Sequence, residues 1–184
     1  MNNGRIYQFK RLDLTLLSVL AIASEFMGSG LLKVWNSEFY FSFSIAIGLI
    51  AMIRWGAAGI LVGMAGGIPG IFFSDMPLWS GILFYVLANA SLGIPILLYG
   101  GRDRDRIAQS PGLLLAYVLI CHASLAVGKG AVIFLVTGEA TGIVDYFGAT
   151  FLITVIDLII CLVLRMREGL ICDMRNYFIQ GEGE

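Results

Sequence analysis

Residues 39–73 read FYFSFSIAIGLIAMIRWGAAGILVGMAGGIPGIFF, two apolar runs separated by a short break at Arg54. A helix needs about 20 apolar residues to cross the hydrocarbon core of a bilayer, and apolar runs recur along most of the chain. The runs lack the alternation of apolar and polar residues that is typical of a barrel wall. Because lipid admits only helices or closed barrels, this stretch predicts membrane-spanning helices.

The composition of the whole chain agrees with this stretch. Of the 184 residues, 58% are hydrophobic and 14% are charged, whereas a soluble protein has about 45–50% and about 25%. Too few polar side chains remain to cover a compact soluble fold, and the composition also excludes a disordered chain and a nucleic-acid-binding protein. The odd number of cysteines, three, indicates packing roles rather than a disulfide framework.

We predict an all-α membrane protein that forms one integral membrane domain over residues 1–184. The expected fold is a bundle of six transmembrane helices, at approximately residues 12–34, 39–53, 57–73, 78–99, 111–137 and 144–164. The first apolar run is too long for the core of a secretory signal and has no clear cleavage site, so we interpret it as a retained helix.

Basic residues are distributed unequally between the two predicted sides of the membrane. Ten of the twelve lysines and arginines fall on the side that carries both termini: Arg5, Lys10, Arg11, Arg54, Arg102, Arg104, Arg106, Arg165, Arg167 and Arg175. Only Lys33 and Lys129 fall toward the other side. Since cytoplasmic segments are enriched in lysine and arginine, we expect both termini in the cytoplasm of a bacterial cell, in a multi-pass protein of its plasma membrane.

The third predicted helix is rich in glycine. Gly59, Gly63 and Gly67 are spaced four apart, and Gly66 and Gly70 repeat this spacing on a neighbouring face. Small residues at this spacing favour close helix packing. The second pair also flanks a proline, and a loosened helix is tolerated in lipid only where protein or water satisfies its backbone. Close packing and a ligand-lining wall are both open interpretations.

Five polar residues lie inside the predicted spans: Glu25, Asn89, His122, Lys129 and Asp157. A charged side chain at the centre of a span costs about 2.5–3.5 kcal/mol on insertion scales, so each of these residues requires a partner, a cavity or a function. Counted at about 1.5 Å per residue along their helices, four of the five lie at mid-membrane or above. They predict a site that is open to the outside.

Each of the ionisable residues has a structural alternative. Lys129 either binds an anionic ligand group or extends toward the outer headgroups. Glu25 pairs with Lys129 or Lys33, or acts as a proton-linked carboxylate. His122 is the single histidine of the chain and is either a ligand contact or a hydrogen-bonded packing residue. Asp157 is interpreted as a structural or partner-facing group.

Aromatic residues gather at the predicted outer ends of the helices, where they form a headgroup belt or a lid over a ligand. We predict an outward-facing pocket for a small planar solute with an anionic or carbonyl group. The expected lining residues are Lys129, Asn89, Trp35, Asn36, Tyr85 and Tyr146, together with His122 and Glu25. The sequence has no metal-ligand cluster or cofactor motif, so we expect neither a metal nor a cofactor.

Motifs for catalysis are absent from the sequence. It has no nucleophile with a His/Asp pattern, no HExxH zinc helix and no phosphate-binding glycine loop. We therefore expect a protein that is not an enzyme and that draws any energy for transport from another chain or from an ion gradient.

The layout resembles the substrate-binding S components of energy-coupling factor (ECF) transporters. The similar features are the chain length, six predicted helices, cytoplasmic termini, short aromatic outer loops, and a last helix that carries Asp157 and ends at the basic residues Arg165 and Arg167. The resemblance implies a subunit that captures a vitamin or related micronutrient from outside with high affinity. It also implies partners, namely a transmembrane coupling subunit and two cytoplasmic ATPases.

In that family, small residues of the first helix contact the coupling subunit. This sequence has Ala21, Ser24 and Gly28 on one helical face, which are therefore the expected partner contacts, although the alanine spacing of the family is not kept. Residues 24–33 instead resemble the first helix of small multidrug resistance transporters, in which a membrane glutamate exchanges protons for drug. A membrane scaffold that transports nothing is the third interpretation.

Overall fold

The computed structural model describes residues 3–32, 42–98, 104–138, 142–167 and 169–180. These residues form helices and connecting turns, with no strand among them. Five helical stretches of this described part are long and apolar enough to cross a membrane: Gly4–Ser29, Ser44–Phe73, Leu78–Leu98, Pro111–Thr137 and Tyr146–Arg165. The helical structure and the apolar lengths both support the predicted class, an all-α membrane protein.

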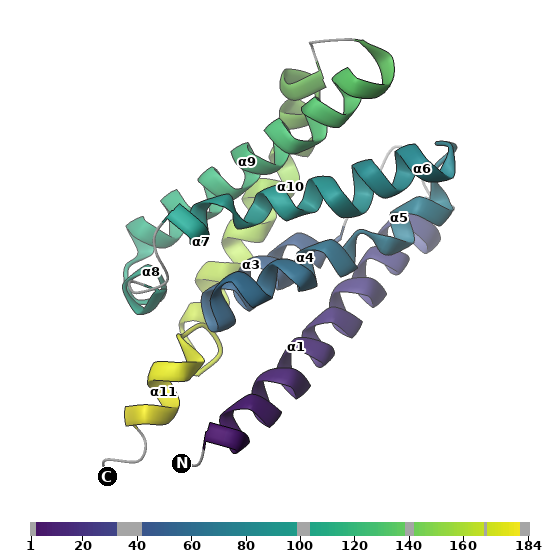
Figure 1. The fold of residues 1–184 in the computed structure, drawn as a ribbon. Helices are drawn as coiled ribbons and strands as arrows, with labels where there is room; N and C mark the ends of the chain where they lie inside the picture. Colours follow the sequence, from purple (N-terminus) through teal and green to yellow (C-terminus); the bar gives the residue numbers. More distant parts are fainter. Residues whose placement is uncertain (1–2, 33–41, 99–103, 139–141, 168, 181–184) are drawn as a thin grey trace.

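The second of these stretches lies at the centre of the structure and folds back on itself (Figure 1). Its outgoing helix, α3 (Ser44–Trp55), ends at Gly56, whose φ of 63° lies in the left-handed region that favours glycine. The returning arm consists of a 3-10 turn and two short helices: η2 (Gly56–Gly59), α4 (Ile60–Gly66) and α5 (Ile68–Phe73). A Cβ on Gly59 would lie 2.3 Å from the Met52 backbone nitrogen, so only glycine permits this contact.

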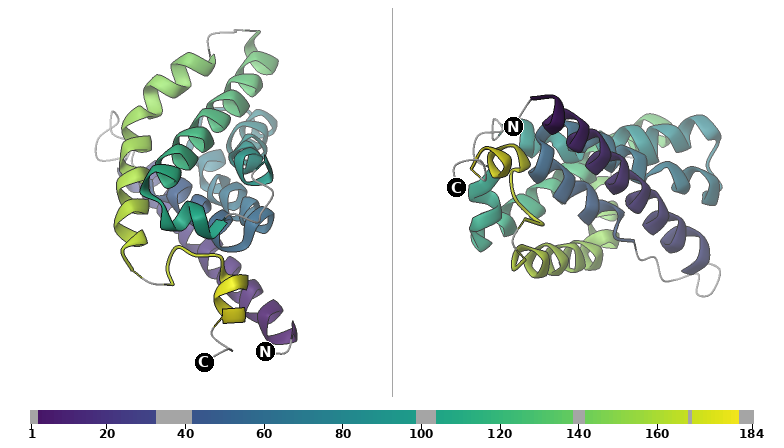
Figure 2. Two further views of the ribbon diagram at one scale, coloured as in Figure 1. Left: turned by 90° about the vertical axis from the view of Figure 1, so that its left-hand side faces the viewer. Right: turned by 90° about the horizontal axis from the view of Figure 1, so that it is seen from below.

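The other helices surround this hairpin. They are α1 (Asn3–Phe26) with its π-helical extension η1 (Met27–Leu32), then α6 (Leu78–Gly81), η3 (Ile82–Leu87), η4 (Ala88–Gly93) and α7 (Ile94–Leu98), followed by α8 (Arg104–Gln109), α9 (Pro111–Thr137), α10 (Gly142–Arg165) and α11 (Met174–Gln180). Figures 1 and 2 show the long helices running side by side, with both termini at one end of the bundle. We name this the terminal end.

The residues at the two ends of helix α9 explain where this helix begins and ends. The Ser110 hydroxyl accepts a hydrogen bond from the Leu113 N–H at 3.4 Å, and Pro111 occupies the first helical position, which needs no N–H donor. At the other end Gly138 adopts a φ of 79°, and its N–H donates to the Phe134 carbonyl at 2.9 Å. A proline start and a glycine stop thus enclose an apolar run that spans the bundle.

Helix α1 begins well before the expected span at residues 12–34. Its polar first turns remain helical because Phe9 packs on aromatic rings of the terminal end, with centroids 6.1 Å from Trp55 and 4.9 Å from Phe178. An apolar run indicates the part of a helix that can lie in lipid, and these contacts extend the helix beyond it.

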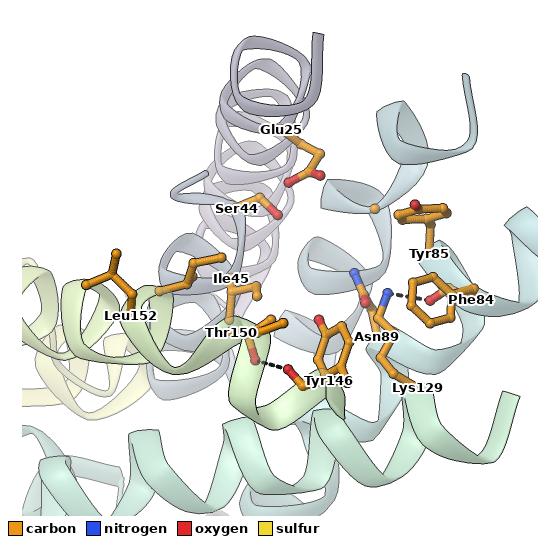
Figure 3. A pocket seen from close by; sticks show the side chains of 13 residues that line it. Glu25, Ser44, Ile45, Phe84, Tyr85, Asn89, Lys129, Tyr146, Thr150 and Leu152 are labelled. Atoms are coloured by element: carbon orange, nitrogen blue, oxygen red, sulfur yellow. Dashed lines mark hydrogen bonds between the residues drawn. The ribbon is translucent and has the colours of Figure 1, made fainter. Parts of the chain in front are cut away.

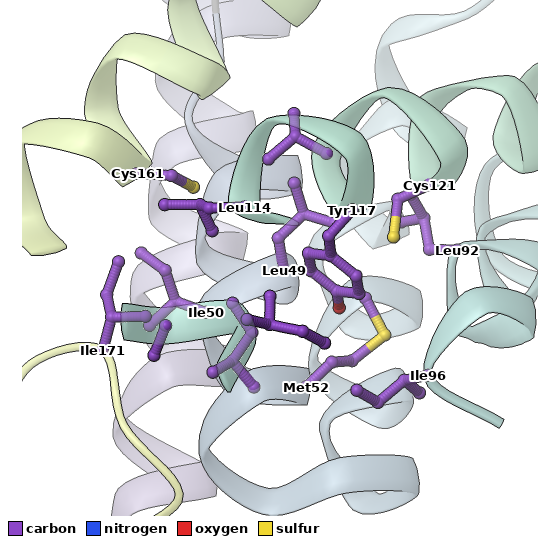
Figure 4. Close-up of a cluster of buried hydrophobic side chains, with 14 of the residues drawn as sticks. Leu49, Ile50, Met52, Leu92, Ile96, Leu114, Tyr117, Cys121, Cys161 and Ile171 are labelled. Carbon is purple, nitrogen blue, oxygen red and sulfur yellow. The ribbon is translucent and has the colours of Figure 1, made fainter. Parts of the chain in front are cut away.

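The main hydrophobic core includes residues of α8 and of the segment before α11, so it lies in the half of the bundle next to the terminal end. Figure 4 shows its side chains from close by. Its fully buried members come from α3, η4, α9 and α10 and include Leu49, Met52, Leu92, Tyr117 and Cys161. The other half of the bundle is therefore the part in which polar residues have room to gather.

Charged residues join distant segments at the terminal end. Arg54 is only 8% exposed, and its guanidinium donates to the Asp13 carboxylate at 2.9 and 3.1 Å. The same guanidinium donates to the carbonyls of Gly169 and Leu170 at 2.8 and 2.9 Å. Further bonds hold the tail on α8: Arg104 to Asp173 at 2.6 Å, the Asp173 N–H to Asp105 at 2.8 Å, and Asn176 to Asp105 at 2.6 Å.

Candidate functional site

A cavity of about 380 Å³ lies among the helices in the half of the bundle opposite the termini. Figure 3 shows the side chains that line it. Each of the five long helical stretches contributes to its lining, which consists of Glu25, Ser44, Ile45, Gly67, Phe84, Tyr85, Asn89, Lys129, Tyr146, Ala149, Thr150, Leu152 and Ile153. Cavities of about 300–1,000 Å³ are typical of small-molecule sites. We name this end of the bundle the pocket end.

Among the described residues of the lining, Lys129 is the only lysine or arginine, and it is 4% exposed. Its Nζ donates a hydrogen bond to the Phe84 carbonyl and lies 4.2, 5.0 and 6.0 Å from the ring centroids of Phe84, Tyr85 and Tyr146. Aromatic faces at such distances attract a cation. We name these three rings the aromatic cage.

Among the carboxylates whose side chains the structure describes, none lies within the 4.0 Å of an ion pair from the Lys129 ammonium. Of the pairings expected for Glu25, the one with Lys129 is therefore not formed, and Lys33 lies outside the described residues. A buried charge is stabilised only when it is paired or hydrogen-bonded. An ammonium has three donors, and one of them is used on Phe84, so the Lys129 charge is only partly compensated.

The aromatic cage depends on the irregular backbone of η3 and on two glycines. Phe84 and Tyr85 lie in this π-helical turn, a geometry that is frequent at functional sites. A Cβ on Gly67 would lie 1.7 Å from the Tyr85 carbonyl oxygen, and a Cβ on Gly70 would lie 2.3 Å from the Tyr85 ring. These glycines thus serve both of the expected roles, because they allow close packing and because Gly67 itself lines the cavity.

Glu25 reaches the cavity from α1, and it is 4% exposed. Figure 3 shows it entering from the side opposite Lys129, with Tyr85 and Asn89 along the wall between them. The Asn89 side-chain amide donates to the Gly63 carbonyl at 3.0 Å, which fixes its orientation toward α4. The cavity therefore contains one acidic and one basic side chain, held apart on different helices.

His122 does not line the cavity but forms a buried network between α9 and α10. Its Nε2 lies 3.1 Å from Asp157 Oδ2, and its Nδ1 lies 3.0 Å from the Thr154 hydroxyl. Thr154 also lies 3.1 Å from the carbonyl oxygen of Thr150, a cavity residue. Asp157 is fully buried within the chain, and its Oδ1 has no hydrogen-bond partner among the described residues.

Proton positions in this network follow from its geometry. A proton must lie between His122 Nε2 and Asp157 Oδ2, because two lone pairs at 3.1 Å would repel each other. If the Thr154 hydroxyl donates to Thr150, it must accept from an Nδ1–H, and the histidine–aspartate pair is then neutral overall. If it donates to Nδ1, the pair carries a negative charge. The neutral arrangement costs less at this buried position.

Two of the expected lining residues, Trp35 and Asn36, lie outside the described residues. Of the others, Glu25, Tyr85, Asn89, Lys129 and Tyr146 share the cavity. The lining residues that the sequence did not indicate include Phe84, Ser44 and Gly67. Thr150 lies one helical turn after Tyr146 on the same face, so this spacing could have indicated it.

The expected partner contacts are directed inward. Ala21 is fully buried in a cluster with Ala51 and Val62, and a Cβ on Gly66 would lie 3.3 Å from the Ala21 Cβ. The Ser24 hydroxyl accepts from the Phe43 N–H at 2.7 Å, and Gly28 is buried. We expected these small residues to face a partner helix. Instead they allow α1 to approach the hairpin, and the exposed face of α1 carries Leu12, Leu16, Val19 and Leu20.

Comparison with protein-family models, with curated proteins and with solved structures finds no match to this chain. Within the described residues, no group of three or more histidine, cysteine, aspartate or glutamate side chains is arranged to hold a metal ion. The function therefore has to be inferred from the cavity and its chemistry.

Proposed function

We propose that this protein is the membrane-embedded, high-affinity substrate-binding subunit of an uptake system, similar to the S components of ECF transporters. It captures a vitamin or related small micronutrient outside a bacterial cell, and a separate ATPase module energises transport. The observation that carries this proposal is the cavity, since it encloses a cation without a carboxylate partner in the described residues. Such a charge suits a polar solute better than a lipid.

The proposal includes a membrane topology. The two arms of the central hairpin count as separate spans, which makes six with α1, the arm from α6 to α7, α9 and α10. Both termini lie in the cytoplasm, because the terminal end carries most of the lysines and arginines. In this orientation the pocket end faces outward, as capture of an external solute requires.

The proposal also requires partners. The sequence has no nucleotide-binding motif, so a transmembrane coupling subunit and two ATPases supply the energy. Since Ala21 is buried, the coupling subunit must contact another surface of the chain. The exposed apolar face of α1 is available for it in the membrane.

Binding and uptake of a co-purifying small molecule test the proposal. The purified chain is extracted with organic solvent, the released compound is identified by mass spectrometry, and its radiolabelled form is used in binding and vesicle uptake. We expect binding by the chain alone, and accumulation only when an energy-coupling module and ATP are added. Lys129→Met should abolish both, whereas Arg11→Met, which changes an exposed basic residue, should preserve both.

Two outcomes would contradict the proposal. Accumulation driven by a proton gradient in vesicles that contain the chain alone, and lost in Glu25→Gln, would indicate the proton-coupled drug transporter instead. A chain that retains and binds no small molecule would favour the scaffold.

A further inference from the structure

We propose that the cavity binds a molecule with a flat ring and one carboxylate, and that Lys129 holds this carboxylate. This inference rests on the proposed function and specifies the substrate class of the same site. It depends on the surroundings of the Lys129 ammonium, on the rigidity of the aromatic cage and on the apolar surface in the rest of the cavity.

The carboxylate follows from the Lys129 ammonium. This ammonium is buried, donates to the Phe84 carbonyl and has no ion-pair partner among the carboxylates whose side chains the structure describes. An ammonium has three donors, so two of them remain for a ligand. A carboxylate accepts both through charge-assisted hydrogen bonds. A neutral amide oxygen accepts them without the charge, and an amine would bring a second cation to the same place.

The aromatic cage positions this ammonium before any ligand arrives. Phe84 meets Tyr85 and Tyr146 edge to face, with ring centroids 5.0 and 6.1 Å apart and an interplanar angle of 82° in each pair. The three rings therefore support one another, and the Lys129 Nζ lies 4.2 Å from the Phe84 centroid. Since the donor is already in place, a carboxylate binds with little reorganisation of the chain.

The flat ring follows from the surfaces that surround the rest of the cavity. Tyr85 and Tyr146 contribute aromatic rings to the lining. Figure 3 shows Ile45 and Leu152 on the side away from Lys129, where they add apolar surface. Aromatic rings attract one another through offset or edge contacts, beyond the area that they bury. A cavity of about 380 Å³ has room for one or two rings.

The orientation of the ligand follows from the two ends of the cavity. Glu25 enters from the side opposite Lys129 (Figure 3), and it has an interaction of its own within the chain. A ligand carboxylate next to Glu25 would bring two acidic groups together, which is unfavourable. The carboxylate of the ligand therefore lies at Lys129, and its ring extends into the rest of the cavity.

Four matched probes test this class: 4-methylbenzoate, 4-methylbenzamide, 4-methylbenzylamine and trans-4-methylcyclohexanecarboxylate. The first three share one flat ring and differ in charge, whereas the last keeps the carboxylate on a puckered ring. Calorimetry with the purified full chain near neutral pH should show 4-methylbenzoate binding about ten- to a hundredfold more tightly than the amide or the amine. It should bind about two- to tenfold more tightly than the cyclohexane probe.

Two substitutions separate the contributions of charge and ring. Lys129→Met should remove the preference for 4-methylbenzoate over the amide. Tyr146→Leu should keep this preference and reduce the preference for the flat ring over the puckered ring. Arg11→Met, which changes an exposed residue, should keep both preferences. A variant that had lost its fold would lose both preferences together, so the two effects are distinguishable from unfolding.

The outcomes also separate this inference from the proposed function. The carboxylate is wrong if the amide or the amine binds as tightly as 4-methylbenzoate, or if no probe binds at millimolar concentration. The flat ring is wrong if the cyclohexane probe binds equally well. These comparisons use the unaltered chain and do not depend on the folding of a variant. A co-purifying compound without a carboxylate would contradict the substrate class alone, whereas a chain that retains and binds no small molecule would contradict the proposed function.

Discussion

The two ends of the bundle treat buried charge in opposite ways. At the terminal end, Arg54 is 8% exposed and forms an ion pair with Asp13, and Arg104 forms one with Asp173. At the pocket end, Lys129 is 4% exposed and has no ion-pair partner among the described residues. The terminal end therefore uses its charges to join segments of the chain, whereas the pocket end keeps a charge that a ligand can satisfy.

The difference has a physical consequence for substitution. Breaking a buried ion pair leaves one charge without compensation and destabilises the fold. Removing the Lys129 charge, which has no ion-pair partner in the described residues, removes the cost of burying that charge and with it one hydrogen bond, to the Phe84 carbonyl. The same kind of substitution should thus affect folding at one end and ligand binding at the other.

The largest effect is expected for Arg54→Met. The change removes the cationic partner of Asp13, which then accepts only from the Trp55 indole N–H, and it releases the carbonyls of Gly169 and Leu170. Loss of one member of a buried pair costs about 3–5 kcal/mol. Thermal unfolding of the purified protein in detergent measures this cost. Arg11→Met, which changes an exposed arginine, is the control and should change the free energy of unfolding by less than about 0.5 kcal/mol. Equal stability of the two variants would contradict the role of the Arg54–Asp13 ion pair.

His122→Leu should have the next largest effect on stability. It removes the hydrogen-bond partner of Asp157, which is fully buried. We expect a loss of about 1.5–3 kcal/mol, because the carboxyl group can take up a proton instead of remaining charged. The double variant with Asp157→Leu should recover most of this loss in the same unfolding measurement, and a double variant that is less stable than His122→Leu would contradict the interpretation.

Gly67→Ala should destabilise the pocket end by about 1–3 kcal/mol, because its Cβ would overlap the Tyr85 carbonyl and the two helices would have to separate. Gly148→Ala is the matched control, since a Cβ there meets nothing within 4 Å, and helix propensity predicts a gain of about 0.5–1 kcal/mol. Unfolding midpoints of the two variants should therefore move in opposite directions. A common direction would show that the glycine contacts do not set the packing.

Lys129→Met should leave the free energy of unfolding unchanged or slightly higher. The substitution removes a buried charge and keeps a flexible apolar chain of similar length next to the aromatic cage. Unfolding in detergent without ligand measures this directly. A loss as large as that of Arg54→Met would mean that Lys129 stabilises the fold, and the contrast between the two ends would fail.

The smallest effect concerns Cys172, which tests the orientation of the terminal end without changing the sequence. Cys121 and Cys161 are buried, whereas Cys172 is half-buried. Burial raises the pKa of the Cys172 thiol, so less of it is thiolate near neutral pH than for a free cysteine at about 8.5. Labelling by a membrane-impermeant maleimide should be slow, should accelerate at more alkaline pH, and should occur in inverted vesicles but not in intact cells. Labelling of intact cells would overturn the proposed topology.

The sequence indicated both the class of protein and several residues of the cavity, in each case from what is costly or favourable in lipid. Apolar runs of sufficient length predict helices in lipid, and in the described residues the structure shows helices without strands, five of them long and apolar enough to cross a membrane. Polar residues that are costly in lipid must lie where a cavity or a partner compensates them. Glu25, Asn89 and Lys129 were selected on this basis, and all three line the cavity.

Contacts between distant segments were decided only by the tertiary structure. The pairing of His122 with Asp157 and of Arg54 with Asp13 joins residues 35 and 41 positions apart, and periodicity within one helix carries no information about such pairs. The Phe84 carbonyl reaches Lys129 from a π-helical turn, which no spacing rule predicted. Ala21 faces inward because Gly66 of α4 lets α1 approach closely. A sequence sets how each helix distributes its side chains, whereas the rotation and approach of its neighbours determine which face is buried.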